Sequence, residues 1–291
     1  MSVVGVTGAS GLLGRAIVAR LQAAGNEVIF FSRDPQSCET RRFAEPLDVE
    51  GLDAVIHLAG EPILGVWTGE KKRRILESRE QGTRLVAEAI RSAQRPPAVL
   101  VSASGANYYG DSGDAELSEE APPGGGFLSE VVQSWEGAAL AAGKDTRVVC
   151  LRLGMVLAAH GGAGKMLYQM FRCGLGGRVG SGRQWMPWIH IDDAAALFVY
   201  ALDCAGLQGP VNAVSPGVVT NLEFTRAMAR VARRPALLPA PAFALRTLLG
   251  GLSDLALHSI RPVADKATGS GFAFRHPDIG EALEELFGKR G

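Results

Sequence analysis

The sequence predicts an α/β fold, a doubly wound parallel sheet with a smaller C-terminal lobe. Two observations support this prediction. A short apolar run at 3–7 leads into a glycine-spaced turn and then into a helical pattern at 15–24. Further strand-like runs then alternate with helical patterns, which is the arrangement that places helices on both faces of a parallel sheet.

The elements follow in order along the chain. After the first strand and helix, strands are expected at 27–31, 54–58, 98–101 and 147–153, and helices at 69–93 and 127–142. The segment between the second and third of these strands is short and contains Pro35 and Pro46, so we expect a truncated third strand–helix unit and an open pocket beside it.

Beyond residue 153 the pattern changes to glycine-rich stretches and a tryptophan pair, Trp185 and Trp188. These residues are expected either to wall a pocket or to fill the core between the two parts of the chain. We expect 1–158 and 189–216 to form the sheet domain, and 159–188 and 217–291 to form a substrate lobe. The cleft should lie at the carboxyl ends of the strands.

The turn after the first strand has the residues needed to bind a dinucleotide phosphate. It consists of Thr7, Gly8, Ala9, Ser10, Gly11, Leu12, Leu13 and Gly14. The first glycine allows a tight reversal, the second lets the backbone approach a pyrophosphate, and the third lets helix pack on strand. Because 37 of the 291 residues are glycine, a merely structural turn is the alternative. The flanking strand and helix favour phosphate binding and a Rossmann-type fold.

The end of the second strand predicts which nicotinamide cofactor fits. An acidic residue there would accept hydrogen bonds from a ribose 2′-hydroxyl and repel a 2′-phosphate. This chain has Ser32 and Arg33 instead, which can donate to phosphate oxygens, so NADP(H) is favoured over NAD(H). The alternative is that Arg33 is a solvated loop residue paired with Asp34.

Composition excludes several function classes. With 47% apolar residues, 21% charged residues and a formal net charge of zero, the chain has no electrostatic bias toward nucleic acid or anionic membranes. The first strand begins too early for a signal peptide, and the longest apolar run, 194–202, is too short to span a bilayer. We therefore expect a cytoplasmic protein. The four cysteines and five histidines lack zinc-site spacing, so no metal site is expected.

Several motifs, in order along nearly the whole chain, resemble the atypical, epimerase-family short-chain dehydrogenase/reductases. They are the turn 7–14, His57-Leu58-Ala59-Gly60-Glu61-Pro62, Ser78-Arg79-x-x-Gly82-Thr83, Ser102-x-Ser104 with Tyr108-Tyr109-Gly110, Trp188-Ile189-His190-Ile191-Asp192-Asp193, and Gly271-Phe272-x-Phe274-Arg275-x-Pro277-Asp278. The C-terminal segment of that family has no assigned function. The resemblance implies bound NADP(H) and, as in many relatives, a possible homodimer.

The cofactor contacts that the resemblance implies fall on several short segments. Besides the glycine turn they are Ser32 and Arg33 at the ribose phosphate, Leu58, Ala59 and Gly60 beside the adenosine, Arg79 on the long helix, and Val156 after the sixth strand. Arg79 has an alternative, because its helix carries other basic residues and an arginine there is commonly part of a solvated face.

The catalytic residues are less clear. Typical members of the superfamily use a tyrosine with a lysine four residues later, but the four tyrosines here are followed at that spacing by Ser112, Gly113, Arg172 and Cys204. Ser104, at the family's serine position, and Tyr109 are the candidate catalytic residues, with Tyr108 and Glu61 behind them. Ser104 has packing or capping as its alternative role. Without a lysine neighbour, a phenol pKa near the usual value of about 10 is expected.

Two functions remain open. One is an NADP(H)-dependent oxidoreductase or nucleotide-sugar-epimerase-like enzyme acting on a small molecule, which the glycine- and tryptophan-rich segments favour. The other is a cofactor-binding sensor or regulatory protein, which the missing tyrosine–lysine pair favours and which suits relatives labelled as cell-division factors.

Overall fold

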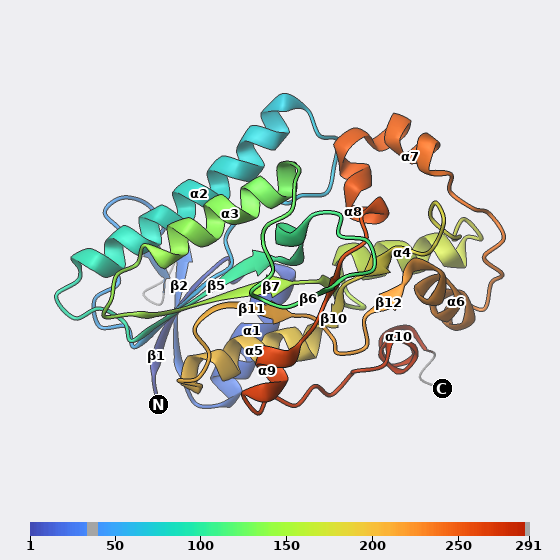
Figure 1. Cartoon of the computed structure of the whole chain (residues 1–291). Coiled ribbons are helices and arrows are strands. Elements are labelled where there is room, and N and C mark those ends of the chain that lie inside the picture. Colours follow the sequence, from blue (N-terminus) through green and yellow to red (C-terminus); the bar gives the residue numbers. More distant parts are fainter. Residues whose placement is uncertain (34–39, 289–291) are drawn as a thin grey trace.

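The computed structural model describes residues 1–33 and 40–288 and contains one large parallel sheet (Figure 1). Its strands are β1 (Val3–Thr7), β2 (Glu27–Ser32), β3 (Thr40–Arg42), β4 (Ala54–His57), β5 (Val99–Gly105), β7 (Arg147–Leu153) and β11 (Gly209–Ala213). They lie in the order β11-β7-β5-β4-β1-β2-β3. The predicted doubly wound parallel sheet is therefore confirmed.

Six short strands pair outside this sheet. They are β6 (Glu116–Leu117) with β13 (Arg261–Pro262), β8 (Met155–Leu157) with β10 (Trp188–His190), and β9 (Trp185–Met186) with β12 (Val219–Thr220). The helices are α1 (Leu12–Ala23), α2 (Gly69–Ser92), α3 (Phe127–Leu140), α4 (Gly162–Arg172), α5 (Ile191–Asp203), α6 (Asn221–Ala232), α7 (Ala242–Leu249), α8 (Asp254–Leu257), α9 (Asp265–Gly269) and α10 (Ile279–Phe287), with 3-10 turns η1 (Ala106–Tyr109) and η2 (Gly250–Ser253).

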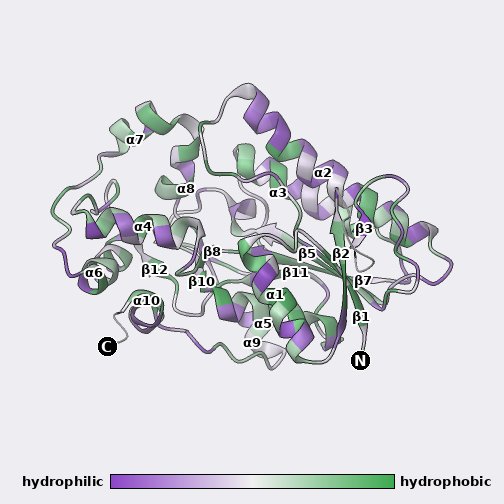
Figure 2. Ribbon diagram, turned by 180° about the vertical axis from the view of Figure 1, so that it is seen from behind, coloured by the Kyte–Doolittle hydropathy of each residue, from purple (hydrophilic) through white to green (hydrophobic). Residues whose placement is uncertain are grey.

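Helices cover both faces of the sheet. Side chains alternate along β5, so that Val101 packs in the core beneath α1 and α5 while Leu100 packs in the core beneath α2 and α3. Figure 1 shows these two helix pairs on opposite sides, and Figure 2 shows the strands between them as largely hydrophobic. The sheet therefore lies between two helix pairs, each packed on its own hydrophobic core.

The third strand–helix unit is truncated, as predicted. β3 has three residues, and the chain passes from it through 43–53 to β4 without a helix. β5, in contrast, runs four residues beyond its predicted end, because Ser102 and Ser104 continue the strand although they are polar. Both serines are buried, so the apolar run ends before the strand does.

The C-terminal part has its own core, formed mainly by α4, α6 and α10. The tail returns to the sheet domain, where the Asp193 carboxylate accepts the backbone N–H groups of Arg275 and His276, each at 2.9 Å. The division into two lobes by residue number stays a prediction. None of the helices in the described part of the chain is long and apolar enough to traverse a bilayer.

Candidate functional site

The glycine turn between β1 and α1 is tightly packed against the loop after β4. Gly8 has a φ of +69°, and a Cβ on it would lie 3.0 Å from the backbone nitrogen of Ala59. A Cβ on Gly14 would lie 2.3 Å from the carbonyl oxygen of Gly8. These two positions therefore require glycine, for the turn and for the close approach of α1 to it.

The N-terminus of α1 faces outward and is uncapped. Its N-cap is Gly11, which offers no side-chain acceptor, and its first turn has no acidic residue. Ser10 and Gly11 are exposed. The first backbone N–H groups of the helix, together with the positive end of its dipole, are thus available to an anion.

A buried relay of side chains fixes the turn to the neighbouring strands. The Thr7 hydroxyl accepts the N–H groups of Leu58 and Ala59, so its own proton goes to His57 Nδ1 at 2.8 Å. His57 Nε2 then donates to the Thr83 hydroxyl at 3.0 Å. Burial lowers the pKa of His57 to about 4, so the ring is neutral in this tautomer.

The end of β2 lies beside the glycine turn, since β1 pairs with β2 in register and Thr7 is opposite Phe31. Ser32 is half-buried and Arg33 is exposed. Within the described residues Arg33 has no carboxylate partner, and Asp34, its alternative partner, lies outside them. The structure thus brings the turn, the β2 end and Leu58–Ala59 together at the carboxyl ends of the neighbouring strands β1, β2 and β4.

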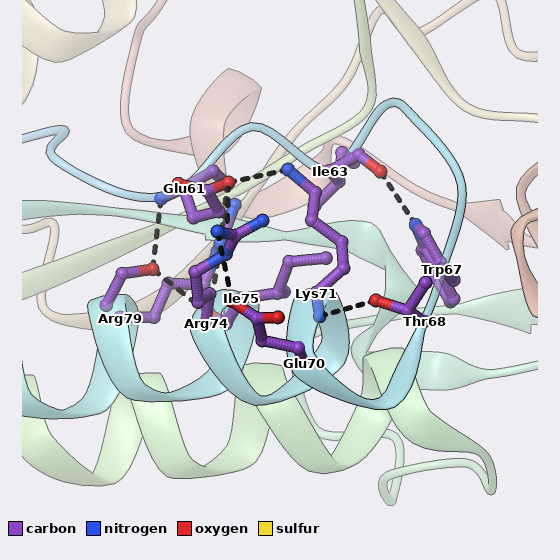
Figure 3. A network of polar contacts seen from close by, with 10 residues as sticks. Glu61, Ile63, Trp67, Thr68, Glu70, Lys71, Arg74, Ile75 and Arg79 are labelled. Atoms are coloured by element: carbon purple, nitrogen blue, oxygen red, sulfur yellow. Dashed lines mark hydrogen bonds and ion pairs between the residues drawn. The ribbon is translucent and has the colours of Figure 1, made fainter.

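Arg79 lies next to these strand ends. Its Nη1 donates to the carbonyl oxygens of Glu61 and Ile75 at 3.0 and 3.2 Å (Figure 3). Its guanidinium carbon is 5.0 Å from the centre of the Trp135 ring. A Cβ on Gly60 would lie 3.4 Å from that carbon. Burial lowers the pKa of Arg79 to about 10, which the charge of Glu61 partly offsets. Arg79 therefore does not belong to a solvated face of α2.

Two neighbouring donors, Arg79 and the indole of Trp135, are not saturated by the protein. Arg79 donates to carbonyl oxygens, with no carboxylate in salt-bridge contact among the described residues. The indole N–H of Trp135 is the one buried side-chain nitrogen or oxygen in the described chain without a hydrogen-bond partner. An acceptor-rich ligand beside Gly60 would suit Arg79.

Glu61 is held by the basic residues of α2. Figure 3 shows its carboxylate between Lys71, whose Nζ is 2.6 Å away, and Arg74 at 3.9 Å. Its backbone N–H donates to Ser78. The hydrogen bond from Lys71 holds the pKa of the Glu61 carboxyl below its usual range. Glu61 is therefore an ionised anchor of the β4–α2 loop rather than a ready proton donor.

Ser104 belongs to a buried ionic network. Its hydroxyl donates to Glu136 Oε1 at 2.6 Å, and Arg152 binds both carboxylate oxygens of Glu136, each at 2.8 Å. Burial opposes the charge on Arg152, but Glu136 keeps its pKa above the ordinary arginine value. Ser104 is 4% exposed. A catalytic role for Ser104 stays a prediction, and its proton is already committed to Glu136.

Tyr109 lies in the same network and not at an open surface. It is 1% exposed, donates to Asn212 Oδ1 at 2.7 Å and accepts from Arg152 Nη1 at 3.0 Å. The expectation of an ordinary phenol pKa is wrong, because burial raises the pKa of Tyr109. Tyr109 is thus a poor acid at neutral pH, and its catalytic role stays a prediction.

Of the two tryptophans, Trp188 lies in the core and Trp185 lies nearer the surface. Trp188 is fully buried and donates to the Gly217 carbonyl at 2.8 Å. Trp185 is half-buried, with the Arg261 guanidinium carbon 4.3 Å from its ring centre. Val156, the remaining predicted cofactor contact, lies half-buried on β8 opposite Ile189 of β10. Trp188 is therefore core filler, as one of the two predicted alternatives has it.

Three potential metal ligands meet at the start of α5. Ligand atoms of His190, Asp192 and His276 lie within 4.8 Å of one another, and sequence spacing did not indicate this group. His190 Nδ1 accepts the backbone N–H of Asp192, so Nε2 carries the ring proton and bonds Glu285. A metal would need the lone pair of a nitrogen that is already engaged. The group serves to cap the helix and hold the tail.

The sequence did not reveal the partners that bury Ser104. Glu136 and Arg152 are separated by sixteen positions, and their pairing depends on how α3 packs against β7. The only local signal was a charged residue at an inward position of each element, between buried apolar neighbours. His57 and Thr83 were likewise visible only as parts of separate motifs.

The chain matches two known protein families. Residues 4–213 match the NAD dependent epimerase/dehydratase family, and residues 240–286 match a domain of unknown function, DUF1731. The chain is 38% identical over 290 residues to the bovine (Bos taurus) epimerase family protein SDR39U1, covering 97% of this chain and 98% of the relative. It is 37% identical to a chloroplastic homologue of that protein from Arabidopsis thaliana, covering 97% of this chain and 86% of the relative.

Solved structures show the same fold. The human epimerase family protein SDR39U1, crystallised with NADPH, superposes with a TM-score of 0.92 at 35% identity, covering 98% of each chain. A nucleoside-diphosphate sugar epimerase from Corynebacterium glutamicum superposes with a TM-score of 0.83 at 33% identity, covering 99% of this chain and 58% of that one. The arrangement of the glycine turn, the β2 end and the β4 loop is therefore that of an epimerase-type fold.

Proposed function

The chain belongs to the NAD dependent epimerase/dehydratase family, and from this premise we propose that it is an NADP(H)-binding oxidoreductase or epimerase-like enzyme for a small molecule. The observation that carries the proposal is the convergence of three segments on one sheet edge. These are the uncapped turn before α1, the β2 end and the loop after β4.

The glycine turn fits the pyrophosphate of a dinucleotide. Gly8 and Gly14 leave no space for side chains, and the N–H groups at the start of α1 have no side-chain acceptor. In the proposal these donors bind the phosphate oxygens, while Leu58 and Ala59 border the adenosine. The relay from Thr7 through His57 holds the two loops at this separation.

The 2′-phosphate of NADP(H) is assigned to Ser32 and Arg33. No acidic side chain occupies the described end of β2, and Arg33 is exposed without a carboxylate partner there. A phosphate monoester carries roughly −1.5 to −2 charges near pH 7, so a neighbouring guanidinium favours NADP(H). That the related human protein was crystallised with NADPH supports this choice.

Bound NADP(H) would supply or accept a hydride at its nicotinamide ring. The protein must then move a proton without the usual tyrosine–lysine pair. Arg79 beside Gly60 is proposed to bind and orient ligand acceptors. The substrate is proposed to be a small molecule in the cleft above the strand ends.

A second function is favoured by a specific observation. The Ser104 and Tyr109 hydroxyls, the obvious proton-transfer candidates, are both buried and bonded inside the protein. An NADPH-binding sensor or regulator would have the same cofactor site and need no proton relay. The two functions therefore share the binding proposal and differ only in turnover.

Parallel fluorescence titrations with NADPH and NADH test the cofactor proposal. Arg33→Ala should weaken NADPH binding by about 1.5–3 kcal/mol, the worth of a hydrogen bond to a charged group, and leave NADH binding nearly unchanged. Arg226→Ala, an exposed arginine on α6, is the matched control. Equal losses for both cofactors would refute the assignment of Arg33. Cofactor oxidation with a panel of carbonyl compounds then separates an enzyme from a sensor.

A further inference from the structure

We propose that Arg42, on the short edge strand β3, is a second arginine for the cofactor 2′-phosphate and sets NADP(H) selectivity together with Arg33. This inference rests on the proposed cofactor function. β3 runs parallel to β2, and Arg42 is the register partner of Ser32. The backbone N–H of Phe43 donates to the Ser32 carbonyl at 2.7 Å and fixes this register at its end.

Strand alternation decides to which side Arg42 points. Its neighbour Phe43 stacks on His57, with ring centres 6.2 Å apart, and lies close to Gly82 of α2. Arg41 points to that same side, where its Nη1 donates to the carbonyls of Asp48 and Glu50. Arg42 therefore points to the opposite side of the strand, the side on which α1 packs.

The glycine turn leads into α1 on that side of the sheet. Ser32 shares this side with Arg42, because register partners on parallel strands project the same way. Neighbouring strands are about 4.8 Å apart, well within the reach of an arginine side chain. A phosphate placed at Ser32 and Arg33 would thus have Arg42 on its other flank.

Arg42 is also uncommitted. It is exposed, and within the described part of the chain its side chain has no hydrogen bond, ion pair or ring contact, whereas the Arg41 side chain binds two carbonyl oxygens and Asp48. Two guanidinium groups and a hydroxyl are suited to a dianionic phosphate and offer nothing comparable to a ribose 2′-hydroxyl. The truncated unit between β2 and β4 makes this possible, because no helix from 43–53 covers the edge.

The test compares the binding of NADPH and of NADH to the intact protein and its variants. Arg42→Ala should weaken NADPH binding roughly tenfold or more, leave NADH binding unchanged and leave the melting temperature unchanged, since the side chain is exposed. Arg42→Lys keeps the charge but loses the planar fork, so it should lose part of that affinity. Arg41→Ala, on the same strand but directed to the other side, should not change the NADPH-to-NADH ratio.

The outcomes separate this inference from the function on which it rests. If Arg33→Ala abolishes NADPH preference while Arg42→Ala behaves like Arg226→Ala, the proposed function stands and the role of Arg42 is refuted. If Arg42→Ala weakens the binding of both cofactors equally, Arg42 supports the fold and does not contact the phosphate. This outcome also refutes the proposed role of Arg42. A wild-type protein without NADPH preference refutes the proposed function and this inference with it.

Discussion

Breaking the buried pair of Glu136 and Arg152 should cost more stability than breaking an exposed ion pair. Arg152 is 2% and Glu136 8% exposed at the side chain, and their closest contact is 2.8 Å. The pair of Arg84 and Glu80 on α2 has the same 2.8 Å contact, but its side chains are 59% and 34% exposed. The closest contacts of the two pairs have the same length, and the pairs differ in burial and in the second hydrogen bond of the buried pair, so Arg84 and Glu80 serve as the exposed reference.

Glu136→Gln keeps the size of the side chain but leaves the charge of Arg152 buried and uncompensated. Removing one member of a buried pair costs about 3–5 kcal/mol. An unfolding entropy of about 2.1 cal/mol/K per residue, over 291 residues, converts this to a fall in melting temperature of about 5–8 °C. Glu80→Gln, which breaks the exposed pair, should cost below about 1 kcal/mol and thus under about 2 °C.

Thermal unfolding followed by circular dichroism measures both variants. The combined variant Ser104→Ala, Glu136→Leu, Arg152→Met removes the orphaned charge and hydroxyl together, so it should be more stable than Glu136→Leu alone. If Glu136→Gln melts within 2 °C of Glu80→Gln, the pair of Glu136 and Arg152 is not held in a buried ionic network. The network would then not explain why Ser104 is buried.

Two further predictions concern the glycine turn and its relay. The pKa of His57 in the folded protein, about 4, is below the ordinary value of 6.5, so the unfolded chain binds more protons between these two pH values. The free energy of unfolding should therefore fall as the pH drops from about 6.5 to 4, by up to about 1.4 kcal/mol per pH unit. In melting curves, His57→Gln should show a smaller loss of stability over this range. Gly14→Ala places a Cβ 2.3 Å from the Gly8 carbonyl oxygen and should weaken NADPH and NADH binding alike. Gly137→Ala, whose Cβ would have no atom within 4 Å, should raise the free energy of unfolding by about 0.5–1 kcal/mol. A normal NADPH affinity in Gly14→Ala would contradict the close packing of the turn.

The proposed cofactor-binding half of the site was predictable because its signals are local. Gly8, Gly11 and Gly14 lie within seven residues, and the strand before and helix after them follow from apolar periodicity. Parallel sheet topology then brings Ser32 and Leu58 to the same edge without further information. For this reason the fold and the convergence of the binding segments agree with the sequence-based expectations.

The catalytic half was not predictable in the same way. The position of Ser104 at the end of β5 does not tell which partner its hydroxyl meets, since Glu136 is 32 residues away on α3. Tyr109 follows on η1, and only the packing of β11 places Asn212 against its hydroxyl. Arg42 was missed because β3 is three residues long and carries no apolar pattern.

The loss of the usual proton relay and the burial of the serine have a common structural basis in α3. This helix directs Val131, Val132, Trp135 and Glu136 into the protein, so its inward side is occupied by packing and by the pair with Arg152. α3 therefore has neither tyrosine nor lysine in the segment where typical relatives have their pair, and its exposed acid, Glu130, lies in the first turn. If the protein turns over a substrate, its proton donor is neither the ionised Glu61, which Lys71 binds, nor a residue on the inward side of α3. The enzyme and sensor hypotheses thus differ in one structural demand, an ionisable group within reach of the substrate.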